Sequence, residues 1–215
     1  IYGGTDTING GADAGDIMDG GAGVNTLRFD SSASLYIDMT SLDADGYWYS
    51  TDQNTGNQLF VKNFSIIYAG DGYNEIYFSN FDITYHGGTG DDGVYDFTAG
   101  GNNIAYLGDG NDYAYFYSGG NNYVDLGAGD DSAFGGSGND TLIGGNGTDT
   151  LDYNSSSSGI TVSLAVTTAQ ATGGGGTDTI SGFENIYGSG FADNLTGDAQ
   201  NNLLYGYNGN DTING

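Results

Sequence analysis

The chain has 215 residues, and 28 Asp and Glu against 2 Lys and Arg give it a formal net charge of −26. This charge makes nucleic acid and anionic membrane surfaces poor partners, and no apolar run approaches the length that spans a membrane. The aromatic fraction of 13% argues against a disordered acidic tail, and the absence of Cys excludes a disulfide framework.

Glycine-rich repeats open the chain, in residues 1–28. The clearest copy is GGAGVNTLR in residues 20–28, and Asp6 and Asn25 are the polar residues of this part that best match the sixth position of the pattern. With 42 Gly and no Pro, such a composition predicts tight turns joined to strands whose N–H groups remain free to pair.

Residues 29–68 interrupt the nine-residue register. A strand ending in Thr26 and Leu27 leads to an aromatic residue and a serine-rich turn, followed by an alternating strand in residues 35–39. The segment returns through an aromatic-led stretch in residues 64–68. We expect extra strands or a hairpin laid against the repeats.

Residues 69–152 carry the most regular pattern. GGSGNDTLI (residues 135–143) and GGNGTDTLD (residues 144–152) both fit G-G-x-G-x-D-x-U-x, in which U is a large apolar residue. Looser copies continue in near register: AGDGYNEIY (69–77), GGTGDDGVY (87–95), TAGGNNIAY (98–106), LGDGNDYAY (107–115), YSGGNNYVD (117–125) and LGAGDDSAF (126–134).

Residues 153–187 form a second excursion that looks like a version of the first, with an alternating strand in residues 160–164 and a return in residues 183–187. Its stretches 155–158 and 173–176 are predicted turns or mobile loops. Repeats resume in residues 188–215, as GSGFADNLT (188–196) and GYNGNDTIN (206–214). Because the pattern runs to both ends and the chain begins with Ile1, we expect a piece of a longer protein.

These repeats resemble the RTX family of secreted bacterial proteins over most of the chain. The resemblance implies that the first six residues of a repeat form a turn and the last three a short strand. Two repeats would make one turn of a right-handed, flattened parallel β-roll, an all-β solenoid. It also implies several Ca²⁺ ions between stacked turns, each held by the sixth-position Asp and by backbone carbonyls, an all-oxygen cage that suits this cation.

Alternate repeats stack on the same edge if two repeats make a turn. Asp92, Asp112, Asp131 and Asp149 then share a first edge, and Asn103, Asn122 and Asp140 share the opposite edge. Because Asn lacks the charge that attracts Ca²⁺, we expect a strong calcium row on the first edge and weaker or partly empty sites on the opposite edge. The alternative is that these residues only make turns, which Asp and Asn favour without metal.

Further ligands follow from the same pattern at both ends of the chain. Asp193 and Asp211 form a same-edge pair near the C-terminus, and Asp6, Asn25 and Asn74 are the best candidates of the poorer N-terminal repeats. The turn glycines of the best repeats complete the predicted sites: Gly88, Gly90, Gly108, Gly110, Gly127, Gly129, Gly136, Gly138, Gly145 and Gly147.

The inward eighth positions predict a thin core. They hold Val94, Ala105, Ala114, Val124, Ala133, Leu142 and Leu151 in the central repeats, and alanine buries little apolar area. We therefore expect calcium binding to supply much of the folding free energy, so that the chain is largely unfolded without calcium.

The outward seventh and ninth positions are rich in aromatic residues. One sheet would present Tyr95, Tyr113, Tyr115 and Phe134, and the other would present Ile104, Tyr106, Tyr123 and Ile143. Such a face is either a contact surface, for a second copy, a neighbouring domain or sugar rings, or a set of cross-strand stacks that only stiffens the sheet.

The chain is not expected to be an enzyme. His86 is the only histidine, it sits where a strand enters a repeat turn, and paired carboxylates such as Asp91 and Asp92 fall at ligand positions. The leading hypothesis is a calcium-binding extracellular structural module of a bacterial surface protein, such as an adhesin, surface layer, sheath or fibre. The alternatives are a calcium-dependent folding and secretion module of a type I-secreted enzyme or toxin, and a carbohydrate binder.

Overall fold

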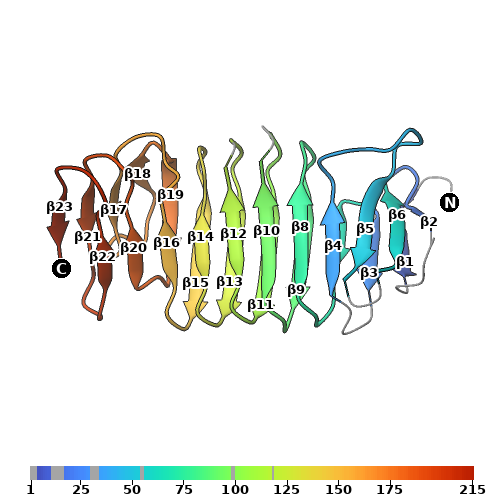
Figure 1. The fold of residues 1–215 in the computed structure, drawn as a ribbon, viewed down its shortest axis with the longest axis horizontal. Helices are drawn as coiled ribbons and strands as arrows, with labels where there is room; N and C mark the ends of the chain where they lie inside the picture. Colours follow the sequence, from blue (N-terminus) through green and yellow to red (C-terminus); the bar gives the residue numbers. More distant parts are fainter. Residues whose placement is uncertain (1–3, 11–16, 30–33, 54–55, 98–99, 118) are drawn as a thin grey trace.

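The computed structural model describes residues 4–10, 17–29, 34–53, 56–97, 100–117 and 119–215. These residues form no helix, and short strands stack in coils along one axis between the two termini (Figure 1). No helix among them therefore has the length and hydropathy needed to cross a membrane. The predicted all-β roll is confirmed.

Two long sheets make up the walls of the roll. In the described residues, sheet A contains, in spatial order, β1 (Thr7–Gly10), β3 (Thr26–Phe29), β7 (Ile66–Tyr68), β9 (Thr84–Gly88), β11 (Ile104–Asp109), β13 (Tyr123–Ala128), β15 (Thr141–Asn146), β19 (Gly176–Ser181) and β18 (Gln170–Gly173). Sheet B contains β2 (Ile17–Asp19), β6 (Gln58–Lys62), β5 (Trp48–Asp52), β4 (Leu35–Asp38), β8 (Asn74–Phe78), β10 (Asp92–Asp96), β12 (Tyr113–Phe116), β14 (Ser132–Phe134), β16 (Thr150–Asp152), β20 (Asn185–Tyr187) and β22 (Leu203–Tyr205). A short third sheet, β17 (Thr161–Ser163), β21 (Asn194–Thr196) and β23 (Thr212–Asn214), follows β18 along the wall of sheet A.

The repeat register is visible in the parallel pairing of successive coils. Val94 pairs with Ala114, and Ala114 pairs with Ala133, so the eighth positions form one inward column in sheet B. Ala105 pairs with Val124 in the matching column of sheet A. Since side chains alternate along a strand, this register sends the seventh and ninth positions outward.

The core is thicker than the sequence predicted. A second inward set, fully buried, flanks the alanine columns and includes Phe78, Leu107, Phe116 and Leu126. Phe78 and Phe116 each follow the ninth residue of a repeat, and their ring centroids lie 6.1 Å apart inside the roll. The alanines at the eighth position leave room for these larger side chains, so the expectation of a thin core was wrong.

The first excursion is a meander within sheet B, not a layer packed against it. After β3 the chain continues to β4, which lies farther along the roll and pairs with β8. It then returns toward the N-terminal end through β5, which is antiparallel to both β4 and β6, and β6 pairs with β2. The strands β4 and β5 have no counterpart in sheet A, where β3 pairs directly with β7. The serine-rich turn predicted after Phe29 lies outside the described residues.

The second excursion repeats this path in the other wall. After β16 the chain runs ahead to β17, turns back through β18, and rejoins sheet A as β19 beside β15. The strands β17 and β18 have no counterpart in sheet B, where β16 pairs directly with β20. Residues 174–175 form the turn between β18 and β19, as predicted for residues 173–176, while Gly173 and Gly176 belong to the two strands. This stretch begins a further repeat, GGGGTDTIS in residues 173–181.

Candidate metal centre

The turns of the roll place the sixth-position aspartates in two rows. On the first edge, where sheet A leads into sheet B, Asp92 begins β10, and Asp112, Asp131 and Asp149 directly precede the strands that follow them. All four are buried, and so is Asp140 on the opposite edge. A short side chain at the end of each tight turn has no path to solvent because the next coil covers it.

One carboxylate oxygen of each aspartate ties its coil to the preceding coil. The Oδ1 atom of Asp112 accepts a hydrogen bond from the backbone N–H of Asp92 at 2.7 Å, and Asp131 does the same for Asp112 at 2.7 Å. Asp149 continues the ladder by accepting from the N–H of Asp131 at 2.9 Å. At its end, Glu184 Oε2 accepts from the N–H of Asp149 at 2.8 Å. Glu184 therefore takes a position in the ligand row that the sequence analysis did not predict.

The other carboxylate oxygen has no hydrogen-bond donor. Oδ2 is buried without a partner in a set of aspartates that share the sixth position: Asp6, Asp92, Asp112, Asp131, Asp140 and Asp149. An unpartnered carboxylate oxygen in a dry site is costly unless a cation neutralises it. This orphaned oxygen is the observation that identifies each turn as a cation site.

Burial raises the pKa of these carboxyl groups. The pKa of Asp92 rises to about 7 and that of Asp112 to about 8, because desolvation disfavours the charged form and neighbouring aspartates add repulsion. The same desolvation raises the pKa of Asp140 to about 7, and those of Asp131 and Asp149 to about 6. A bound cation would reverse this shift by favouring the carboxylate.

No protein cation neutralises the rows. The ion pair between Lys62 and Asp19, at 3.6 Å, is the only one in the described part of the chain, and Arg28 lies over the ring of Tyr68. No three acidic or histidine side chains converge anywhere in these residues, so a cation in any described turn must complete its ligands with backbone oxygens. This hard, all-oxygen donor set fits Ca²⁺, which the turn residues would hold between consecutive coils.

Turn glycines allow the coils to approach closely enough for such shared sites. The predicted glycines form columns on the first edge, at the second position (Gly88, Gly108, Gly127, Gly145) and the fourth position (Gly90, Gly110, Gly129, Gly147), while Gly136 and Gly138 lie on the opposite edge. A Cβ on Gly129 would overlap the carbonyl oxygen of Gly110, and its φ of 150° is unfavourable for other residues. Substitution there would separate the coils that form the cage.

The opposite edge is more varied than the first. The Oδ1 atom of Asn122 accepts from the N–H of Asn103 at 3.1 Å, and Asp140 accepts from the N–H of Asn122 at 2.8 Å. Asp178, which the sequence analysis missed, extends the row by accepting from the N–H of Asp140 at 3.0 Å. Its Oδ2 accepts from the Thr172 hydroxyl at 2.5 Å. The sixth position of GGGGTDTIS was the available signal for this residue.

The C-terminal pair lies on the opposite edge too. Asp211 accepts from the N–H of Asp193 at 3.0 Å, as the repeat pattern requires. Both oxygens of Asp193, however, already accept hydrogen bonds, from the N–H and hydroxyl of Ser189 and from the N–H of Ile160. The Asp193 turn therefore lacks the orphaned oxygen that marks the other sites.

A second, exposed ladder accompanies the first edge. The fifth-position residue Asp91 accepts from the N–H of Asn111 at 2.7 Å, Asn111 from Asp130 at 2.8 Å, and Asp130 from Thr148 at 2.9 Å. These bonds run in the opposite direction from those of the buried row. The adjacent acids thus differ: the side chain of Asp91 is exposed, whereas that of Asp92 faces the candidate cation site.

The outer face of sheet B carries a two-dimensional array of rings, here called the aromatic grid. Its members are Tyr36, Tyr77, Tyr95, Phe97, Tyr113, Tyr115 and Tyr117. Tyr77 stacks on Tyr95 at 5.0 Å between centroids, and Phe97 stacks on Tyr117 at 4.9 Å. Phe97 is 56% exposed and Tyr113 45%. Phe134 was predicted to lie on this face but is 7% exposed, because Tyr153 of the second excursion packs edge-on against it.

The outer face of sheet A has a narrower column. His86 lies between Tyr68 and Tyr106, with ring centroids 4.2 Å and 5.0 Å away and nearly parallel planes. Burial, assisted by nearby Arg28, lowers the pKa of His86. The histidine therefore fills a stack between two tyrosine rings.

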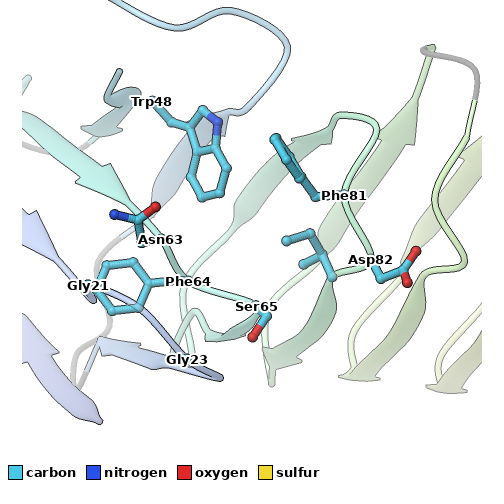
Figure 2. A pocket seen from close by; sticks show the side chains of 9 residues that line it. Gly21, Gly23, Trp48, Asn63, Phe64, Ser65, Phe81 and Asp82 are labelled. Atoms are coloured by element: carbon cyan, nitrogen blue, oxygen red, sulfur yellow. The ribbon is translucent and has the colours of Figure 1, made fainter. Parts of the chain in front are cut away.

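A cavity of about 280 Å³ lies on the opposite edge, near the N-terminal meander. Figure 2 shows Trp48 and Phe81 on its walls with Phe64 below, and the Trp48 and Phe81 ring centroids are 5.9 Å apart. Asp82 is the single carboxylate among the lining residues, and its Oδ1 accepts from the N–H of Asn102. The cavity thus lacks the paired acidic groups that general acid–base chemistry uses.

Comparison with known proteins supports the interpretation of the turns. A family model described as the RTX calcium-binding nonapeptide repeat matches residues 116–151 and 187–215, with four copies of the repeat. No curated protein matches the chain. The matched segments contain Asp131, Asp140 and Asp149, three of the residues with orphaned oxygens. The matched segments of this β-roll are therefore RTX calcium-binding nonapeptide repeats, a repeat typical of proteins that bacteria secrete.

Proposed function

We propose that this chain is a calcium-stiffened structural segment of a bacterial extracellular surface protein, such as an adhesin, surface layer, sheath or fibre, and that it has no catalytic role. Calcium holds neighbouring coils together at their turns, so that the roll resists bending and unravelling. The chain's own side chains provide the anchors, and the ions supply the positive charge that it lacks.

The observation that carries this proposal is the continuity of the first-edge ladder. It begins at Asn74, whose Oδ1 accepts from the N–H of Leu35 in the first meander, passes through four aspartates, and ends at Glu184 beyond the second meander. Hydrogen bonds thus join coil to coil from β4 of the first meander to the coil that follows the second meander. Such a path suits a segment that bears load along its axis.

The aromatic grid favours a role in assembly. It is a broad exposed ring surface on one wall, and large exposed apolar patches usually mark contact sites. We propose that a second copy of this chain covers it once calcium has reduced the repulsion between two strongly acidic molecules.

Sedimentation and electron microscopy of the calcium-loaded chain test this proposal. We expect association that grows with protein concentration, and we expect Phe97→Ser combined with Tyr117→Ser to abolish it. Tyr106→Ser, on the outer face of sheet A, is the matched control and should associate like the parent. A chain that stays monomeric in calcium at every concentration would contradict the assembly role.

Two rival functions have distinct outcomes. A catalytic domain beside this segment in the full-length gene would overturn the structural role in favour of a folding and secretion module, whereas further repeats would support it. If the chain is monomeric and a neutral polysaccharide shields the tyrosines of the aromatic grid from solvent, the chain would instead be a carbohydrate binder.

A further inference from the structure

Two sixth-position asparagines provide the hydrogen bonds that the polar groups of their own turns need, so these turns do not require a cation. In Asn74, Oδ1 accepts from the N–H of Leu35 at 3.1 Å, which is the role that Oδ1 of an aspartate has elsewhere in the ladder. Its Nδ2 donates to the carbonyl oxygens of Gly72 at 2.7 Å and Gly70 at 3.4 Å, and to Oδ1 of Asp92 at 2.8 Å. The buried amide therefore has acceptors for its donor group.

Asn25 repeats this arrangement nearer the N-terminus, on the opposite edge. Its Oδ1 accepts from the N–H of Asp6 at 3.2 Å. Its Nδ2 lies among three carbonyl oxygens, those of Gly21 at 3.3 Å, Gly23 at 3.4 Å and Asn63 at 3.0 Å. The hydrogen-bond partners determine the amide orientation, since a flipped group would set its oxygen against carbonyl oxygens.

The carbonyls that receive these bonds belong to the same repeat positions in both turns. Gly21 and Gly70 are second-position residues, and Gly23 and Gly72 are fourth-position residues. In Asp92 and the following aspartates, the atom that corresponds to Nδ2 is Oδ2, which is buried and has no donor. The same point in the turn is therefore an N–H donor in the asparagine repeats and an orphaned oxygen in the aspartate repeats.

The packing around the asparagine turns is also different. Residues 17–85 bury a dense set of large apolar side chains, contributed mainly by the first meander: Leu35, Ile37, Met39, Trp48, Leu59, Val61 and Phe64. The following coils bury fewer large apolar side chains, since Leu107, Phe116 and Leu126 lie beside the eighth-position residues Ala105, Ala114 and Ala133. More apolar burial per coil means that less of the folding free energy must come from bound ions.

We propose that Asn25 and Asn74 exclude calcium by placing their amide N–H groups where the ion would lie, and that residues 17–85 fold without calcium. This part then serves as a preformed end on which the calcium-dependent coils assemble, beginning with Asp92 against Asn74. The inference concerns the folding of the roll and is independent of the surface role proposed above.

Hydrogen exchange of the full chain, followed by mass spectrometry, tests the division. In chelator at pH 7.5, backbone amides of β6, β7 and β8 should keep the protection that they have in calcium. Backbone amides of β11, β13 and β15 should exchange at least tenfold faster in chelator than in calcium. Equal loss in both groups of strands would overturn the proposal.

A substitution tests the amide itself. Asn74→Asp should raise the calcium content by one ion, measured by elemental analysis of the desalted chain, and should make the protection of β8 depend on calcium. Asn102→Asp adds the same charge at an exposed fifth position and should leave the calcium content unchanged. An unchanged calcium content in Asn74→Asp would refute the assignment.

The reverse substitution covers the case in which Asn74→Asp does not fold. Asp112→Asn places an amide at an orphaned oxygen of the first edge. It should lower the calcium content and increase the protection of β12 in chelator relative to the parent chain. Lower protection of β12 in this variant would contradict the proposed role of the amide.

Discussion

Lowering the pH from 7.5 to 5 is expected to stabilise the calcium-free chain. The pKa values of Asp92 and Asp140 are raised from 3.8 to about 7 in the folded chain, mainly by desolvation. For a group whose folded pKa is raised, the stabilising contribution is complete below the unfolded pKa and is lost as the pH rises through the folded pKa. The calcium-free roll should therefore lose stability between pH 5 and pH 7.5.

The pKa shifts set the size of this effect. Protonation at pH 5 should recover about 2 kcal/mol for each of Asp92 and Asp140, with allowance for water that enters a turn without an ion. These two groups alone then change the free energy of unfolding by about 4 kcal/mol, which is a large part of the stability of an ordinary domain. Saturating calcium should abolish or reverse the pH dependence in this range, because it favours the charged carboxylates.

Urea unfolding of the calcium-stripped chain, followed by far-ultraviolet circular dichroism, measures the effect at pH 5, 6 and 7.5. A high NaCl concentration throughout screens the general repulsion of an acidic chain. Asp112→Asn should reduce the pH dependence, since the pKa of Asp112 rises to about 8. Asp91→Asn removes the same charge from an exposed position and should leave the pH dependence unchanged. Stability that is equal or greater at pH 7.5, or an equal response of the two variants, would refute the reasoning.

Three further substitutions test the site and the core. Asp140→Asn should lower the calcium content by one ion in elemental analysis, and an unchanged content would remove Asp140 from the ligands. Gly129→Ala should destabilise the calcium-loaded roll by about 3 kcal/mol in urea, because its Cβ meets the Gly110 carbonyl at a φ that favours glycine. Gly190→Ala, whose Cβ has open space, should cost far less. Phe116→Ala should lower stability by about 4 kcal/mol, since the ring is fully buried, and a loss below 1 kcal/mol would place it outside the core.

Much of the roll could be predicted because each position of the repeat has one structural role. The eighth-position residues, from Val94 to Leu151, lie in the inward columns as the period of nine requires. The alternation of edges also follows from the period, so Asp92, Asp112, Asp131 and Asp149 share one ladder. Local spacing alone determines both features.

The remaining features depend on contacts between residues far apart in sequence. Phe78 and Phe116 lie between repeats, so the period gives them no position, yet both turn inward. Strands β5 and β18 are antiparallel to their neighbours, which depends on pairing and not on their own residues. The different behaviour of Asn74 and Asp92 rests on one atom, and a sequence pattern treats such residues as near equivalents.

The two meanders have a mechanical consequence for the shape of the roll. Each adds two strands to one wall only, the first to sheet B and the second to the wall of sheet A. Two strands lengthen that wall by about 10 Å, so a roll with a single meander would curve toward its shorter side. Because the second meander lengthens the opposite wall, it bends the axis back. The coils before the first meander and those after the second can thus share one direction.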